Sequence, residues 1–178
     1  MAKIGIILGS TRDDRAGLAI AQWVTDLAQG RDVDYELIDL KAFDVPILTS
    51  SVIPMAANKN YEDPQVQAWS DAVDSCDGYI FVTPEYNHSV PGAFKNAVDS
   101  LGAEWVGKPI AYVGYSFTGG IRAVEAWRLI MANFSMKQLR TQLDISLNTD
   151  MKDGTFTPAD FKVEIVENIC VELEEVLS

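Results

Sequence analysis

Apolar and polar residues follow one another along this chain in blocks that switch between the period of a strand and the period of a helix. Five short apolar or alternating runs predict strands over Lys3–Leu8, Asp34–Asp39, Gly78–Thr83, Pro109–Gly114 and Leu139–Ser146. Five longer runs with apolar residues three and four positions apart predict helices over Arg15–Gln29, Pro64–Ser75, Val90–Leu101, Gly120–Ala132 and Pro158–Val176. This alternation predicts one α/β domain spanning residues 1–178, with helices on both faces of a parallel sheet.

The hydrophobicity of the strands predicts their order in the sheet. Lys3–Leu8 and Gly78–Thr83 are apolar nearly throughout, as strands buried on both faces are, so we place them centrally. Asp34–Asp39 alternates polar and apolar residues, which favours an edge. With right-handed crossovers, this pattern predicts a five-stranded parallel sheet of order 2-1-3-4-5, the flavodoxin-like three-layer sandwich. A ligand of such a sheet binds where the strand order reverses, beyond the carboxyl ends of the first and third strands.

The loop after the third strand is the most informative segment, and it reads Thr83-Pro84-Glu85-Tyr86-Asn87-His88-Ser89-Val90-Pro91-Gly92. Tyr86 can stack on a ring, Glu85 and Asn87 can form hydrogen bonds, and Pro91 is expected in the first turn of the next helix. The loop is suited to hold a flat polar heterocycle. His88, the single histidine, is interpreted as a surface residue of this loop, and a place lining the substrate cleft is the alternative.

The loop after the first strand has the composition of an anion site, and it reads Gly9-Ser10-Thr11-Arg12-Asp13-Asp14-Arg15. Free N–H groups and the helix dipole at such a turn favour a bound anion. Ser10 adds a hydroxyl, and Arg12 and Arg15 add charged, forked donors that suit phosphate oxygens. Two solvated arginines at a helix start are the alternative interpretation. Neither a dinucleotide fingerprint nor a Walker A loop is present.

Three other segments leave alternatives open. The long connection from Leu40 to Asn60 is expected to be functional or mobile. Trp105, in the connection before the fourth strand, either covers a site or caps the core. Arg122 and Arg128 of the following helix are interpreted as solvated or intersubunit charges. That helix follows the loop Tyr115–Arg122, whose two adjacent glycines permit close backbone approach, and its apolar stripe, predicted as core or subunit interface, consists of Ile121, Val124, Trp127, Met131 and Phe134.

Composition excludes several classes of function. The chain has 178 residues, 48% of them hydrophobic, and a formal net charge of −12, which fits one sizeable core and disfavours nucleic acid or an anionic membrane as partner. No segment reaches the roughly 18 apolar residues of a membrane span, and the first strand begins too early for a signal peptide, so we expect a cytoplasmic protein. Cys76 and Cys170 are expected to be reduced core residues on helical stripes. A single histidine disfavours a histidine-based metal site or a Ser-His-Asp triad.

The chain resembles the NADPH-dependent FMN reductase family, which includes quinone, azo and chromate reductases, over nearly its whole length. Three motifs in order and spacing carry the resemblance: Gly9-Ser10-Thr11-Arg12-x-x-Arg15-x-Gly17, Thr83-Pro84-Glu85-Tyr86-Asn87-x-Ser89-x-Pro91-Gly92-x-x-Lys95-Asn96-Ala97, and Gly119-Gly120-x-Arg122-Ala123. It implies a flavodoxin-like fold, bound FMN, and a homodimer or tetramer. Asp13 and Asp14 depart from the family pattern and are expected to point to solvent, because a carboxylate beside a phosphate is unfavourable. The cofactor-binding residues that the resemblance implies are Ser10, Arg12 and Arg15 for the phosphate, and Pro84, Glu85, Tyr86, Asn87 and Ser116 around the isoalloxazine ring.

The resemblance also implies an NAD(P)H oxidoreductase that works by ping-pong, two-electron chemistry. NADPH or NADH passes a hydride to the flavin, and a quinone, an azo compound or another small acceptor, flavin itself included, then takes the electrons. Since the flavin supplies the chemistry, no catalytic acid or base and no metal is expected. Backbone N–H groups of the Pro84–Asn87 loop are expected to stabilise negative charge on the reduced ring. The alternatives are a flavodoxin-like electron carrier, whose phosphate loop would lack arginine, and a non-catalytic flavin-binding module.

Overall fold

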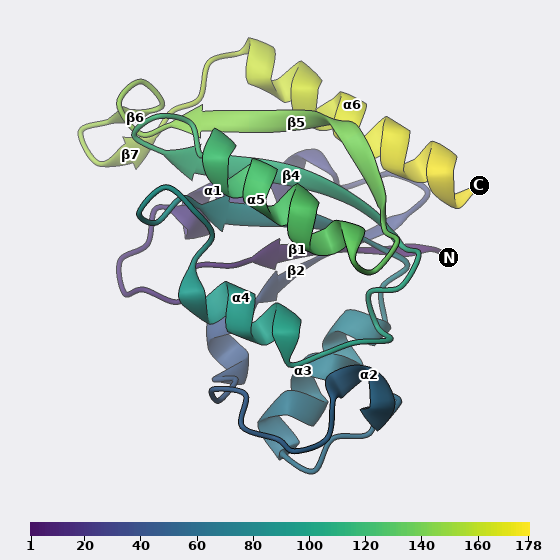
Figure 1. Ribbon diagram of the computed structural model, residues 1–178. Coiled ribbons are helices and arrows are strands. Elements are labelled where there is room, and N and C mark those ends of the chain that lie inside the picture. Colours follow the sequence, from purple (N-terminus) through teal and green to yellow (C-terminus); the bar gives the residue numbers. More distant parts are fainter.

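The computed structural model describes residues 1–178 and has a parallel sheet between two layers of helices (Figure 1). The strand order β2-β1-β3-β4-β5 confirms the predicted flavodoxin-like topology. The first two strands have the predicted bounds, and the other three extend one to two residues beyond them because their ends still pair with neighbours. The strands are β1 (Lys3–Leu8), β2 (Asp34–Asp39), β3 (Gly78–Pro84), β4 (Pro109–Ser116) and β5 (Lys137–Ser146).

Five helices cover the sheet, two on one face and three on the other (Figure 1). They lie where the periodicity predicts them, but each differs from its predicted bounds by one to three residues at an end. Pro91 is one such correction, since it is the N-cap of its helix, with φ −66° and ψ 134°, and not part of the first turn. The helices α1 (Gly17–Leu27) and α6 (Phe161–Leu177) share one face, and α3 (Pro64–Asp74), α4 (Gly92–Asp99) and α5 (Ile121–Ala132) share the other.

Each face of the sheet has its own core of buried side chains. Cys170 belongs to the core under α1 and α6, and Cys76 to the core under α3, α4 and α5, so the sheet separates the two free thiols. Both are buried core residues as predicted, although Cys76 follows α3 and does not lie on a helical stripe. Trp105 is fully buried, which confirms the interpretation that it caps the core and does not cover a site. Ile121, predicted to belong to a stripe of core or subunit-interface residues, is 45% exposed and outside the core of the chain, because it is the first residue of α5.

The connection from residue 40 to residue 60 is more ordered than its sequence indicates. It contains the 3₁₀ helix η1 (Leu40–Phe43) and the short helix α2 (Pro54–Ala57). Asn96 of α4 holds its middle, because its side-chain amide donates to Pro46 O and accepts from Leu48 N, both at 2.9 Å. A small hairpin between β5 and α6, with strands β6 (Met151–Lys152) and β7 (Thr155–Phe156), was also not predicted (Figure 1).

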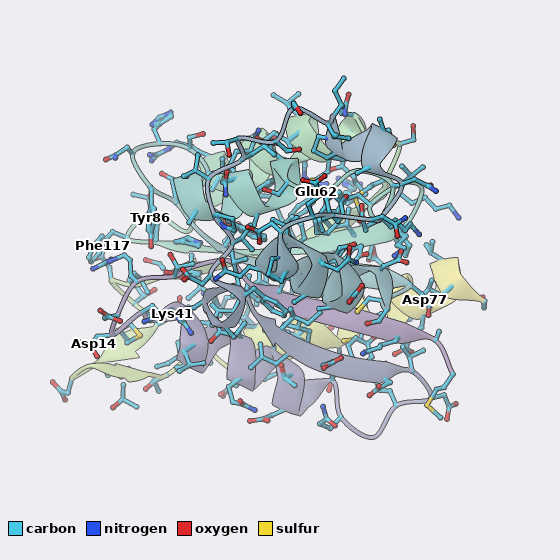
Figure 2. All side chains as sticks on the ribbon, turned by 90° about the horizontal axis from the view of Figure 1, so that it is seen from below. Asp14, Lys41, Glu62, Asp77, Tyr86 and Phe117 are labelled. Carbon is cyan, nitrogen blue, oxygen red and sulfur yellow. The ribbon has the colours of Figure 1, made fainter.

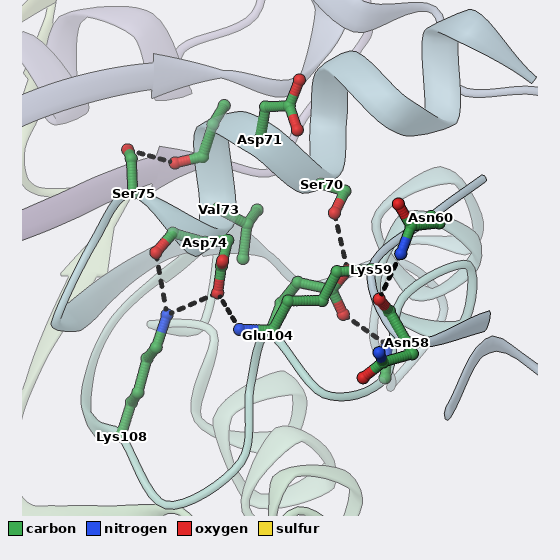
Figure 3. Close-up of polar contacts among 12 residues, drawn as sticks. Asn58, Lys59, Asn60, Ser70, Asp71, Val73, Asp74, Ser75, Glu104 and Lys108 are labelled. Carbon is green, nitrogen blue, oxygen red and sulfur yellow. Dashed lines mark hydrogen bonds and ion pairs between the residues drawn. The ribbon is translucent and has the colours of Figure 1, made fainter. Parts of the chain in front are cut away.

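A polar cluster joins α3 to the connection that precedes β4 (Figure 3). Asp74 forms ion pairs with Lys59 at 2.7 Å and Lys108 at 3.6 Å. The fully buried carboxylate of Glu104 accepts hydrogen bonds from Ser70 Oγ at 2.6 Å, from the Tyr61 hydroxyl and from Gly102 N. Every charged group of this cluster has a partner within the chain, so its role is to hold these segments together.

No helix in the structure has both the length and the apolar composition needed to cross a membrane. No group of three or more histidine, cysteine, aspartate and glutamate side chains is placed to hold a metal ion.

Candidate cofactor site

The loops that follow β1, β3 and β4 meet at one end of the sheet. Gly9 N donates to Val82 O at 3.0 Å, and Glu85 N donates to Tyr115 O at 3.1 Å, so the three loops begin side by side. Figure 2 shows labelled residues of these loops, Asp14, Tyr86 and Phe117, at the same end of the molecule. This is the point of the sheet at which the strand order reverses, and it is where the sequence predicts a ligand.

The phosphate-type loop and the aromatic loop face each other across this end of the sheet. The Ser10 hydroxyl, which is 1% exposed, lies 3.0 Å from the Tyr86 hydroxyl. Gly9 lets the start of this loop lie directly against α4, because a Cβ at Gly9 would lie only 2.0 Å from the Phe94 ring. The two residues predicted to bind opposite ends of one ligand are therefore direct neighbours.

The backbone between β1 and α1 offers unused hydrogen-bond donors. None of the backbone N–H groups from Ser10 to Ala16 donates a hydrogen bond within the structure. The N-cap of α1, Ala16, has no side-chain acceptor either, so the positive end of the helix is uncapped. Such a run of free amides at a helix start is a binding site for an oxyanion.

The two arginines of this loop differ in their surroundings. The Arg15 side chain is 9% exposed, and one Nη forms an ion pair with Asp39 at the end of β2. Its Nε and other Nη are buried and have no hydrogen-bond partner. Arg12 is exposed at the rim of the loop. Arg15 thus keeps two donors for a ligand, while Arg12 can contribute only a solvent-screened charge.

The two acidic residues of the loop do not approach the free donors. Asp13 is exposed and forms an ion pair with Lys41 of η1, which lowers the pKa of its carboxyl. Asp14 is exposed and adopts the left-handed region with φ 50°. The expectation that both point to solvent is confirmed, and Lys41 further offsets their charge.

Tyr115 is a member of this site that the sequence did not single out. It is 4% exposed, and its hydroxyl is buried without a hydrogen-bond partner. A Cβ at Gly17 would lie 2.2 Å from that hydroxyl, so Gly17 leaves the room for it under the start of α1. Burial raises the pKa of the phenol, while the neighbouring Ser10 hydroxyl and the charge of Arg15 act in the opposite direction. At neutral pH Tyr115 is therefore a protonated donor.

These groups together fit an oxyanion and nothing positively charged. Three buried donors lack partners, namely Arg15 Nε, one Arg15 Nη and the Tyr115 hydroxyl. An unsatisfied buried donor costs about 1–3 kcal/mol, so a ligand that accepted hydrogen bonds from these groups would remove that cost. Arg15 is thus not a solvated arginine, whereas Arg12 is exposed, and phosphate binding by this loop stays a prediction.

The loop after β3 forms a tight hairpin turn. Tyr86 and Ser89 exchange backbone hydrogen bonds of 3.0 and 3.1 Å, and Asn87 and His88 between them have φ of 49° and 73°, as in a type I′ turn. The sequence predicted that backbone N–H groups of the Pro84–Asn87 loop are free to stabilise charge on a ligand. Pro84 has no N–H, and Glu85 N and Tyr86 N already donate within the fold, so only the N–H of Asn87 is free. His88 is exposed on the surface of this turn, as interpreted.

Three of the residues expected around the isoalloxazine ring make contacts within the chain or are buried in the sheet. The Glu85 carboxylate accepts from Arg122 Nη1 at 2.7 Å, and its expected contact with a ligand stays a prediction. The Ser116 hydroxyl accepts from Thr118 N and Gly120 N at 3.0 and 2.9 Å and thereby shapes its loop. Pro84 is the buried last residue of β3.

Arg122 and Arg128, interpreted as solvated or intersubunit charges, also make contacts within the chain that the sequence did not predict. Arg122 bridges two loops through Glu85 and Thr118. Arg128 donates to Leu139 O at 2.8 Å and lies over the Tyr112 ring. Neither interaction is visible in the sequence, because the partners lie in other elements.

Comparisons with known proteins identify the family. The model of the family described as NADPH-dependent FMN reductase matches residues 2–150. The NAD(P)H-dependent FMN reductase ntnL of Nectria sp is 42% identical over 160 residues, which are 85% of this chain and 79% of that protein. The 2-hydroxy-1,4-benzoquinone reductase of Burkholderia sp is 31% identical over 121 residues, 64% of this chain and 60% of that protein. Among solved structures, the flavoenzyme NAD(P)H:(acceptor) oxidoreductase FerB of Paracoccus denitrificans shares the fold with a TM-score of 0.77 and 24% identity, covering 98% of both chains. The chain belongs to the NADPH-dependent FMN reductase family.

Proposed function

We propose that this chain is an FMN-dependent NAD(P)H oxidoreductase that transfers two electrons to quinones, azo compounds or similar flat acceptors, free flavin included. The observation that carries the proposal is the group of unpartnered buried donors on Arg15 and Tyr115, next to the Ser10–Tyr86 contact. A phosphate monoester such as that of FMN accepts from all these donors. Family membership and the FMN, quinone and flavoenzyme names of the relatives support the choice of cofactor and substrates.

The residues of this chain bind and orient the cofactor. Ser10, Arg15, Tyr115 and the free amides of residues 10–16 would hold the phosphate, with Arg12 adding charge at the rim. The 84–89 turn and the 116–120 loop would border the isoalloxazine ring, with the Asn87 N–H as the free backbone donor. Bound FMN supplies the chemistry, since it accepts a hydride from NAD(P)H and passes two electrons to the second substrate. The protein then needs no catalytic acid or base, and we give that role to none of these side chains.

Two other functions are less well supported. A flavodoxin-like electron carrier would not use NADPH, and a non-catalytic flavin-binding module would have no use for a second substrate. The relatives with enzyme names argue for turnover over both. The two arginines in the phosphate loop argue in the same direction, because we expect a carrier's loop to rely on serine and threonine.

We further propose a homodimer, with a tetramer as the alternative. Large apolar side chains remain strongly exposed, among them Ile47 at 73%, Ile53 at 71% and Leu129 at 81%. Side chains of this kind would be buried in a subunit interface if they form one patch on the assembled protein. A cytoplasmic location also belongs to the proposal, and the two unpaired cysteines are consistent with a reducing compartment.

An absorption spectrum of the purified protein under nitrogen tests the function. We expect a yellow protein that is bleached by NADPH or NADH and regains its colour when a quinone is added. A carrier would keep its colour with NADPH and form a stable semiquinone when titrated with dithionite. A protein that oxidises NADPH no faster than free FMN does would contradict the enzyme assignment.

A further inference from the structure

The motif Gly119-Gly120-x-Arg122 has a structural role that the cofactor site alone does not explain. The Arg122 guanidinium donates to Glu85 Oε1 at 2.7 Å and to Thr118 Oγ1 at 3.2 Å. A third contact joins Arg122 Nη1 to His88 Nδ1 at 3.2 Å. Arg122 therefore links the 84–89 turn after β3 to the 116–120 loop after β4, the two loops that flank the proposed ring site.

The paired glycines bring the start of α5 close enough for this link. Gly120 has φ +75°, and a Cβ there would lie 2.4 Å from Tyr115 N. Because the helix starts directly against β4, Arg122 N can donate to Glu85 Oε2 at 3.2 Å. Gly120, the N-cap of α5, has no side chain to accept this N–H, so Glu85 caps the helix from another loop.

The charges of this pair are unequally shielded. The Glu85 side chain is 6% exposed, and Arg122, at 42%, is the cation that forms an ion pair with it. Removing Arg122 would leave a nearly buried carboxylate without its counter-charge beside the proposed ring site. Removing Glu85 would leave a cation there instead. The nearly buried carboxylate would act strongly on a neighbouring group, while the more exposed guanidinium would act more weakly because solvent screens it.

We propose that Glu85 and Arg122 form a neutral clamp, which fixes the spacing of the two ring-flanking loops and keeps the wall of the flavin site free of net charge. Arg122 is then a positioning residue, and it sets the reduction potential of the bound flavin through Glu85. The inference rests on the proposed function. Reduced flavin carries more negative charge than oxidised flavin, so an unpaired carboxylate disfavours the reduced form and an unpaired guanidinium favours it.

The test is the midpoint potential of FMN bound to four proteins: wild type, Arg122→Gln, Glu85→Gln and the double variant. We expect a more negative potential for Arg122→Gln, a more positive one for Glu85→Gln, and a value near wild type for the double variant. A tenfold change in the ratio of the affinities for reduced and oxidised FMN corresponds to about 30 mV for two electrons, and we expect a shift of at least that size in Arg122→Gln and a smaller shift of opposite sign in Glu85→Gln. Glu125→Gln is the control, because this residue is on the same helix, is 66% exposed and lies 3.8 Å from its Arg128 partner.

General loosening of the site is a different outcome and contradicts the clamp. It would lower the affinity for both redox forms, so the two single variants would shift in the same direction or not at all. Arg122→Lys provides a second measurement that keeps the charge, and we expect the wild-type potential with weaker FMN binding, measured by fluorescence on the refolded apoprotein. If wild type binds no FMN, the proposed function fails. If wild type binds FMN and all four potentials agree, only the clamp fails.

Discussion

Replacing Tyr115 by phenylalanine tests the cofactor site with two effects of opposite sign. The substitution removes one atom, the buried hydroxyl that has no partner within the chain. An unsatisfied buried polar group costs about 1–3 kcal/mol, so we expect the apoprotein to gain about 1 kcal/mol in its free energy of unfolding. For a domain of this size, that corresponds to a rise of about 2–4 °C in the melting temperature.

The same substitution should weaken FMN binding. A hydrogen bond to a charged phosphate contributes about 1.5–3 kcal/mol, which is a factor of about 10 to 150 in Kd. The assays are thermal denaturation of the apoprotein and titration of FMN followed by its fluorescence. Riboflavin, which has no phosphate, should bind wild type and variant equally.

Tyr112→Phe is the matched control on the same strand. The Tyr112 hydroxyl donates to Gln138 Oε1 at 2.8 Å, so its removal should destabilise the apoprotein and leave FMN affinity unchanged. If Tyr115→Phe destabilises the apoprotein, or binds FMN as tightly as wild type does, the reasoning from unpartnered donors is refuted.

Three further predictions concern neighbouring groups. Arg15→Ala should weaken FMN binding more than Arg12→Ala, because Arg15 is nearly buried with free donors while Arg12 is exposed; the comparison of the two Kd values checks this. Lys162→Met leaves the buried Asp150 without the ammonium group 2.6 Å away, so chemical denaturation should show a loss of about 3–5 kcal/mol. Burial raises the pKa of Asp144, so the native state binds this proton more tightly than the unfolded chain and stability falls as the pH rises through the raised pKa. Asp144→Asn should therefore be more stable than wild type at pH 7, with the difference vanishing below pH ~4, and an equal difference at both pH values would contradict this.

The sequence predicts the sheet and the two facing loops because both depend on local pattern. Uniformly apolar strands must be central. Ser10 and Tyr86 each lie two positions after the end of such a strand, and because the two strands are neighbours, the loops that carry these residues face each other. The small hairpin of β6 and β7 escapes prediction because strands of two residues have no period to detect. Ile121 shares the stripe of the buried α5 residues and is nevertheless exposed, because helical periodicity gives the direction of a side chain but not how far along the helix the core extends.

The missed parts of the site depend on tertiary contacts. Tyr115 looks like any apolar strand residue, and only its meeting with Gly17 across the fold leaves the hydroxyl free. Glu85 and Arg122 are 37 positions apart, so neither suggests the other in sequence. A tyrosine at the carboxyl end of a strand that is separated by one other strand, β3, from the strand carrying the phosphate-type loop is the signal that could have directed attention to Tyr115.

A crystal structure of the protein with FMN tests the central claim most directly. We expect the phosphate within hydrogen-bond distance of the Tyr115 hydroxyl and Arg15 Nε, and the ring beside the turn at Asn87. A phosphate bound elsewhere on the chain, with these donors still unpartnered, would contradict the account.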